Sequence, residues 1–293
     1  MSRSRSSRAP AALLALGALV LTGCGGDDEA DVTVGAVEVS DAGAADGRVQ
    51  LPGAAEVGAT GSSSATVDLA VAIDGGGVDE EIPVTLRLDY DSAVVEADAG
   101  GYAVDNEFTA ADVVDAPSGA DFSSVDDLVG VRYRETFDEH GSSTGTELLD
   151  GGTVTDAQRA AYEEFGSQVS STTFDYPDEP VGLGATWSAV TSIEQQGFEL
   201  DVTYHYELTA LDGDDYTIAI TYDEAIDDSL SLDGTDADVT GRLEGGGTTS
   251  GTLGNPLAVA STIEQHLDLD VDADGDAISM TMDIAIDVAP QAA

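Results

Sequence analysis

The sequence predicts a mainly β protein, built as one large curved antiparallel sheet or half-barrel with two short helices packed on it. Three observations indicate this fold. From residue 62 onward, apolar and polar residues alternate with a period of two, which is typical of strands with one buried face. Turns rich in Gly and Asp separate the alternating segments. Two segments in the middle of the chain instead space their apolar residues as a helix does.

Apolar residues occupy one face of each alternating segment. They are Val67, Leu69, Val71 and Ile73; Val84, Leu86, Leu88 and Tyr90; Val202, Tyr204, Tyr206 and Leu208; Leu267, Leu269 and Val271; and Ile278, Met280, Met282, Ile284, Ile286 and Val288. Turn signals lie between segments at 74–77, 99–101, 212–214, 245–247 and 274–276. We expect hairpins of about ten residues per strand and about eleven strands, and a sheet of that size curls or closes.

Two helices are expected between the strands. Thr155 and Gln158 have the spacing of a capping box, and the apolar residues that follow predict a helix over 155–170. A shorter helix is expected over 122–129, where the apolar residues on one side are Phe122, Val125, Leu128 and Val129. We expect both helices to cover the dry face of the sheet.

Residues 1–23 are predicted to be a lipoprotein signal peptide. Three arginines precede an apolar run over 11–21, which is shorter than the roughly 20 residues that span a bilayer. The run ends in Leu-Thr-Gly-Cys, which resembles the bacterial lipobox, and Cys24 is the only cysteine of the chain. We therefore expect lipid attachment at Cys24, which would hold the protein on the extracytoplasmic face of the cell membrane.

The rest of the chain divides into two parts. Residues 24–61 are rich in Gly, Ala and acids, and we interpret them as a flexible tether. Within this tether, residues 31–39 alternate and favour an edge strand. Residues 62–293 form the predicted single antiparallel β domain.

The net charge is −49, from 58 acids and nine basic residues, all of them arginine. This balance excludes electrostatic binding to nucleic acid or to an anionic membrane face, since both need a basic patch. The surplus of carboxylates is typical of proteins adapted to high salt, and we infer a halophilic or haloalkaliphilic source.

Catalytic and metal motifs are weak. Residues 141–145 match G-x-S-x-G around Ser143, and His266 could complete a triad, but the acidic strand end before them favours a hairpin turn. His140, His205 and His266 are too scattered for a metal motif, and His205 falls on the polar face of its strand. Residues 270–276 begin like a calcium loop, yet Thr281 stands where a glutamate is required, so a hairpin is favoured. We expect no enzyme activity, no metal and no cofactor.

Adaptable and aromatic residues on the dry face are the candidate ligand-lining residues. They are Trp187, Tyr204, Tyr206, Tyr222, Met280, Met282 and Ile284. The only tryptophan, Trp187, is expected either to anchor the core at a bend or to form the wall of a ligand cavity.

Residues 176–187, with the sequence YPDEPVGLGATW, resemble a signature of uncharacterised actinobacterial secreted lipoproteins, a family of unknown function. The resemblance covers about 165–290 and implies an architecture and an envelope location without a reaction. The order of strands and helices is also similar to the half-barrel of lipoprotein carriers, such as the outer-membrane lipoprotein chaperone and mycobacterial lipid-binding lipoproteins.

These observations favour a non-catalytic cell-envelope lipoprotein that displays an acidic β domain outside the membrane. One alternative is a carrier of a lipid or other apolar ligand in a half-barrel cavity, and an extracytoplasmic hydrolase is the other. An enclosed apolar cavity would favour the carrier, and a filled interior would favour a structural or interaction module. The sequence identifies no protein partner.

Overall fold

Long antiparallel strands dominate the computed structural model, which describes residues 31–75, 78–118, 120, 122–149, 151, 154–163, 174–195, 198–232, 235–273 and 276–291. The strands are β1 (Asp31–Val34), β2 (Glu38–Asp41), β3 (Thr60–Gly75), β4 (Val78–Asp98), β5 (Gly101–Asp115), β6 (Arg132–Asp138), β7 (Ser143–Leu148), β8 (Thr186–Gln195), β9 (Phe198–Asp212), β10 (Asp215–Leu232), β11 (Thr235–Thr252), β12 (Asn255–Ala273) and β13 (Asp276–Pro290). The helices are η1, a 3-10 helix (Ser123–Leu128), and α2 (Asp156–Ala161). The predicted mainly β class is confirmed.

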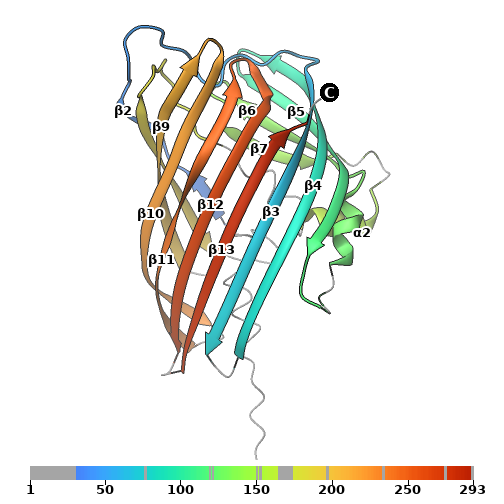
Figure 1. Cartoon of the computed structure of the whole chain (residues 1–293), viewed down its shortest axis with the longest axis vertical. Coiled ribbons are helices and arrows are strands. Elements are labelled where there is room, and N and C mark those ends of the chain that lie inside the picture. The colour runs from blue at the N-terminus through green and yellow to red at the C-terminus, as the bar shows by residue number, and fades with distance from the viewer. Residues whose placement is uncertain are drawn as a thin grey trace, which may run out of the picture.

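The strands form one antiparallel sheet in the order β1-β8-β9-β10-β11-β12-β13-β3-β4-β5-β6-β7, with β2 also paired to β8. Its two ends, β1 and β7, do not pair with each other among the described residues, so the sheet is not closed into a barrel. Figure 1 shows the long strands from β10 to β4 in front, with the shorter strands at both ends curling behind them. This is the curved half-barrel that the alternation predicts.

The pairing of β13 with β3 joins the two halves of the chain. Apolar residues meet in register across this pair, with Ile284 opposite Leu69 and Met282 opposite Val71. Each strand therefore points its apolar side chains to the same concave face, as the period-two pattern requires.

Eight of the described strands are longer than the predicted ten residues, and β4 has 21. Three register shifts along its pairing with β5 mark bulges, which bend and twist the strand. A curved sheet can thus continue through positions at which the sequence alternation breaks. The turn expected at 245–247 is also wrong, because these glycines lie within β11.

Residues before the main sheet pack against one of its edges. β1 and β2 both pair with β8, as the alternation over 31–39 favoured. Val49 forms a bridge with Val181, and Leu51 is fully buried. Part of the segment that the sequence assigns to the tether therefore lies on the β domain.

The helices differ from the expectation. In α2 the capping box is present: the backbone N–H of Gln158 donates to Thr155 Oγ1 over 3.1 Å. This helix ends at Ala161, and most of the remainder of the predicted 155–170 lies outside the described residues. The second predicted helix is the 3-10 helix η1, because Phe122, Val125 and Leu128 repeat every three residues, as a 3-10 turn does. Within the described residues, neither helix is long and apolar enough to cross a membrane.

Three apolar clusters fill most of the concave face. The first joins β9–β13 and β3 around Leu267 and Met282. The second lies around Trp187 and Leu208, where β8–β10 meet the segments at Leu51 and Tyr176. The third packs η1 and α2 on β4–β6, as expected for helices that cover the dry face.

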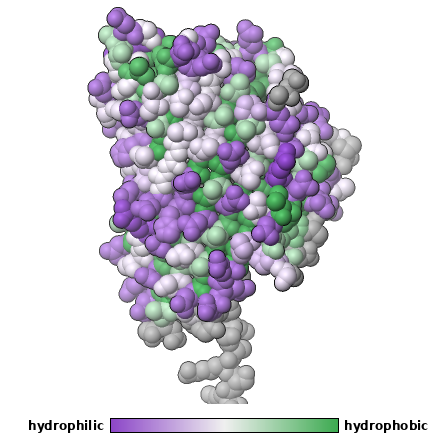
Figure 2. Space-filling model, in the orientation of Figure 1, coloured by the Kyte–Doolittle hydropathy of each residue, from purple (hydrophilic) through white to green (hydrophobic). Residues whose placement is uncertain are grey.

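The outer surface is strongly acidic, and Figure 2 shows hydrophilic side chains over much of one face. Local compensation is sparse, as nine arginines face 58 acids. Arg134 lies 2.6 Å from Asp105, and Arg242 bridges Asp223 and Glu244 on the surface.

We expect the melting temperature to rise with salt because screening weakens the repulsion among the surplus carboxylates. Between about 0.01 M and 1 M salt, the screening length falls from roughly 30 Å to 3 Å. Thermal unfolding followed by circular dichroism over this range provides the measurement. A flat or falling curve would mean that the acids are compensated locally.

Candidate functional site

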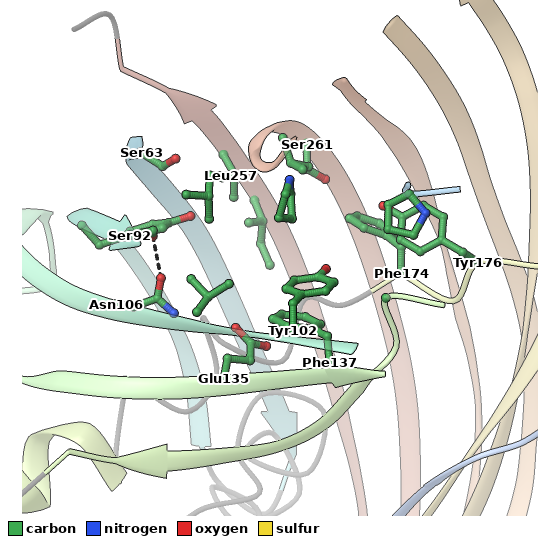
Figure 3. A pocket seen from close by; sticks show the side chains of 18 of the residues that line it. Ser63, Ser92, Tyr102, Asn106, Glu135, Phe137, Phe174, Tyr176, Leu257 and Ser261 are labelled. Carbon is green, nitrogen blue, oxygen red and sulfur yellow. Dashed lines mark hydrogen bonds between the residues drawn. The ribbon is translucent and has the colours of Figure 1, made fainter. Parts of the chain in front are cut away.

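A cavity of about 170 Å³ lies on the concave face where the three apolar clusters meet. It lies near the starts of β3, β5 and β12 and the end of β13. In Figure 3, β5 and β6 cross below it and Leu257 and Ser261 lie above. Its position follows from the curvature, which brings strands far apart in the sheet to face one another.

Aromatic rings form much of the cavity wall. Tyr102 and Phe137 are paired across β5 and β6, and their rings stack with centroids 4.7 Å apart. The hydroxyl groups of Tyr176 and Tyr216 are hydrogen-bonded over 3.2 Å, which links the 174–185 segment to β10. The other rings that line the cavity are Tyr90, Tyr133 and Phe174.

Polar side chains also face the cavity. Ser92 donates a hydrogen bond of 2.5 Å to Asn106 Oδ1, drawn in Figure 3. Glu135 is 8% exposed, and its Oε1 has no hydrogen-bond partner among the described residues. The same holds for Ser261 Oγ. The cavity therefore combines apolar walls with unsatisfied polar atoms, which is typical of a ligand site.

Burial raises the pKa of Glu135 from its usual 4.5 to about 8, because the low-polarity surroundings disfavour the carboxylate. Burial also raises the pKa of Tyr90, Tyr102 and Tyr133, and the charge of Glu135 raises the pKa of each of these tyrosines further. Near neutral pH the carboxyl group of Glu135 is therefore mainly protonated and able to donate a hydrogen bond.

Stability should fall as pH rises through the titration of Glu135. Because the pKa is higher in the folded state, the stabilising contribution is complete below about 4.5 and is lost up to about 8. A tenfold change in acid dissociation constant corresponds to about 1.4 kcal/mol, so the loss amounts to several kcal/mol. Glu135→Gln removes this component, and its free energy of unfolding should change less between pH 5 and pH 9.

Urea unfolding at fixed high salt measures both profiles. Glu207→Gln is the matched control, since it removes an exposed acid from β9. Parallel pH profiles for the wild type and Glu135→Gln would contradict the assignment.

Among the sequence candidates, Trp187 is 2% exposed and its ring stacks on Tyr206 at 5.5 Å. The Trp187 Nε1–H donates to the Asp175 carbonyl oxygen over 2.9 Å. Burial is also the main reason that the pKa of Asp175 is raised to about 6. These contacts place Trp187 in the core, where it fixes the position of the bend before β8.

The other candidate residues lie beside the cavity rather than in its wall. Tyr204 contacts both Tyr206 and Tyr222, and Tyr222 donates a hydrogen bond of 3.0 Å to Gln265 Oε1. Met280, Met282 and Ile284 are buried in the first cluster, around Leu267. Tyr222 and Ile284 also border a separate open hollow across the central strands.

The weak catalytic motifs lie in hairpins. Ser143 is an exposed residue at the start of β7, directly after the turn from β6. His266 lies 2.6 Å from Asp283 and 3.0 Å from Asp268, and His205 is exposed. Asp270 accepts a hydrogen bond from Ser279 across the β12–β13 pair, which confirms the hairpin. The described residues contain no group of three or more His, Cys, Asp or Glu arranged to hold a metal ion.

Residues 158–254 match the model of a family of unknown function, DUF6263. This match contains the YPDEPVGLGATW segment and β8–β11, so the resemblance to an uncharacterised domain is confirmed for this part of the chain. No curated protein matches the sequence.

The sequence analysis missed Glu135, although a signal for it was present. Tyr133, Glu135 and Phe137 alternate with Arg132, Arg134 and Thr136 along β6. The two aromatic residues assign the odd positions to the dry face, and Glu135 falls between them. An acid at such a position, flanked by aromatic residues, is a pattern that indicates a buried carboxyl group.

Proposed function

We propose that this protein is a non-catalytic lipoprotein of the cell envelope whose β domain binds a small apolar ligand. The anchor would be the acylated Cys24, and the domain would stand on the extracytoplasmic face of the membrane. The observation that carries the binding role is the cavity of about 170 Å³ lined by aromatic rings and unsatisfied polar atoms. An engineered apolar cavity of about 150 Å³ binds benzene, so this volume suits one ring or a short alkyl group.

The size of the cavity limits which ligands the proposed carrier could hold. A complete acyl chain needs more space than this cavity offers, and side chains such as Leu267 and Met282 pack closely in the first apolar cluster. We therefore favour a compact ligand, or one group of a larger ligand. The similarity to secreted lipoproteins and the acidic surface support an exported protein from a saline habitat.

The binding role can be tested with toluene as the probe. Ser261→Phe places a ring where the Ser261 side chain faces the cavity, and it should abolish binding. Thr262→Phe adds the same ring to an adjacent, exposed position of β12 and should leave binding intact. Toluene should raise the melting temperature of the wild type and of Thr262→Phe, since a ligand of the folded state stabilises it. No shift in the wild type at saturating toluene would refute the proposal.

If Cys24 carries the lipid anchor, the wild type and Cys24→Ala should behave differently when they are expressed in a bacterium. The wild type should partition into detergent because Cys24 carries acyl chains, which give stable membrane attachment. Cys24→Ala should be unprocessed or released into the aqueous phase. Phase partitioning followed by mass spectrometry of the N-terminus measures this, and equal partitioning of the two chains would exclude lipidation at Cys24.

A further inference from the structure

We infer that the ligand of this cavity is a small organic cation, a protonated amine on an aromatic or apolar group, with Glu135 as its counter-ion. This inference rests on the proposed binding function and specifies its ligand class. It begins from the buried carboxyl group of Glu135, which lines the cavity and whose Oε1 has no partner among the described residues. A buried carboxyl oxygen without a partner is unfavourable, and an ammonium group both donates to it and favours the ionised carboxylate.

The described residues supply no positive charge at this site. The residues that line the cavity include no arginine, lysine or histidine. The arginines of β6 point to the other face, where Arg134 binds Asp105 and Arg132 lies 3.7 Å from both Asp105 and Glu107. Glu135 is therefore separated by the strand from the nearest arginines in sequence, and a cation from solution is the complementary partner.

The aromatic rings around Glu135 favour a cation over an anion. The stacked pair of Tyr102 and Phe137 lies beside the Glu135 carboxyl group in Figure 3, and Tyr133 precedes it on the same face of β6. The faces of aromatic rings attract ammonium groups, most strongly where water is excluded. An ammonium group beside Glu135 favours the ionised carboxylate, so the carboxyl group releases its proton when the amine binds. The carboxylate and the ring faces then both attract the amine, whereas an anion would be repelled by the ring faces.

The electrostatic field of the whole molecule also favours a cation. A net charge of −49 raises the concentration of cations near the surface and speeds their association. The cavity volume of about 170 Å³ limits the ligand to one ring with a short amine or to a group of similar size. Selectivity among cations would then come from the rings and the shape of the cavity.

The test compares three probes of similar shape on the full chain at pH 7 and fixed salt: toluene, benzyl alcohol and benzylamine, which is protonated at this pH. Calorimetric titration should show that benzylamine binds roughly tenfold or more tightly than benzyl alcohol. Glu135→Gln should weaken benzylamine roughly tenfold or more and change toluene binding by about twofold at most. Glu207→Gln should change neither affinity, although it makes the same Glu-to-Gln change on the exposed face of β9.

The outcomes separate the two proposals. If toluene binds and benzylamine binds no more tightly than benzyl alcohol, the cation inference is wrong and the binding function stands. This comparison uses the wild type, so it holds even where Glu135→Gln does not fold. Benzylamine binding that persists in Ser261→Phe would come from the acidic surface and would also overturn the inference. If none of the three probes binds, the proposed function fails and the inference fails with it.

Discussion

Replacing Trp187 by alanine is expected to lower the free energy of unfolding by about 3–5 kcal/mol, the range found for buried aromatic residues. The side chain is 2% exposed, stacks on Tyr206 and bonds the carbonyl oxygen of Asp175. Its removal leaves a cavity in the cluster that holds the 174–185 segment against the sheet. The backbone carbonyl group of Asp175 also loses its donor, which adds to the loss.

Urea unfolding followed by far-ultraviolet circular dichroism measures this loss at constant high salt. Trp187→Phe is the informative partner variant, since it keeps a ring next to Tyr206 and removes only the indole N–H and part of the volume. We expect Trp187→Phe to fall between the wild type and Trp187→Ala. A change below about 1 kcal/mol for Trp187→Ala would show that the residue is not a core anchor.

Gly247→Ala should destabilise the protein by more than the 1–3 kcal/mol typical of overpacking. A Cβ atom at this position would collide with the carbonyl oxygen of Thr262 on the neighbouring strand β12. Because the obstacle is backbone rather than a flexible side chain, strands β11 and β12 would have to separate locally. The same region of β11 pairs with β10 on its other side, so both pairings would be disturbed.

Gly145→Ala is the matched control, as it makes the same change in another strand. A Cβ atom there would have Thr136 Oγ1 as its nearest neighbour, at 3.6 Å, which is ordinary contact. We expect a neutral or slightly stabilising effect, because alanine restricts the unfolded chain. Equal melting temperatures for the two variants would refute the close approach of β11 and β12.

The glycines at 245–247 show where a sequence pattern predicts the wrong structure. Three consecutive glycines predict a turn, yet Gly245 lies opposite Tyr222 in register and the ring of Tyr222 occupies the space that a side chain would fill. Glycine favours a turn, and glycine also allows two strands to approach closely, so the residue type alone does not distinguish the two. Only the partner across the sheet distinguishes them, and that partner is not local in sequence.

The curved sheet itself was predictable because its cause is local. Alternation assigns Met280, Met282 and Ile284 to the buried face, and the structure buries all three. The cavity was not predictable in this way, since its lining depends on how far the sheet curls. Tyr102 and Leu257 both line it from strands that are distant in sequence and do not pair with each other. Periodicity predicts the face of the sheet on which each residue lies. The tertiary curvature determines where facing parts of the sheet leave a space between them.

The place of β13 between β12 and β3 has a consequence for the order in which the protein folds. β3 begins at Thr60, and its partner on that side is the last strand of the sheet, Asp276–Pro290. Pairing over so long a stretch of chain gives a high contact order, and such proteins fold slowly, on the order of milliseconds to seconds. During synthesis or translocation from the N-terminus, one edge of β3 stays unpaired until β13 emerges. This unpaired edge is a site at which a chaperone would act or aggregation would begin.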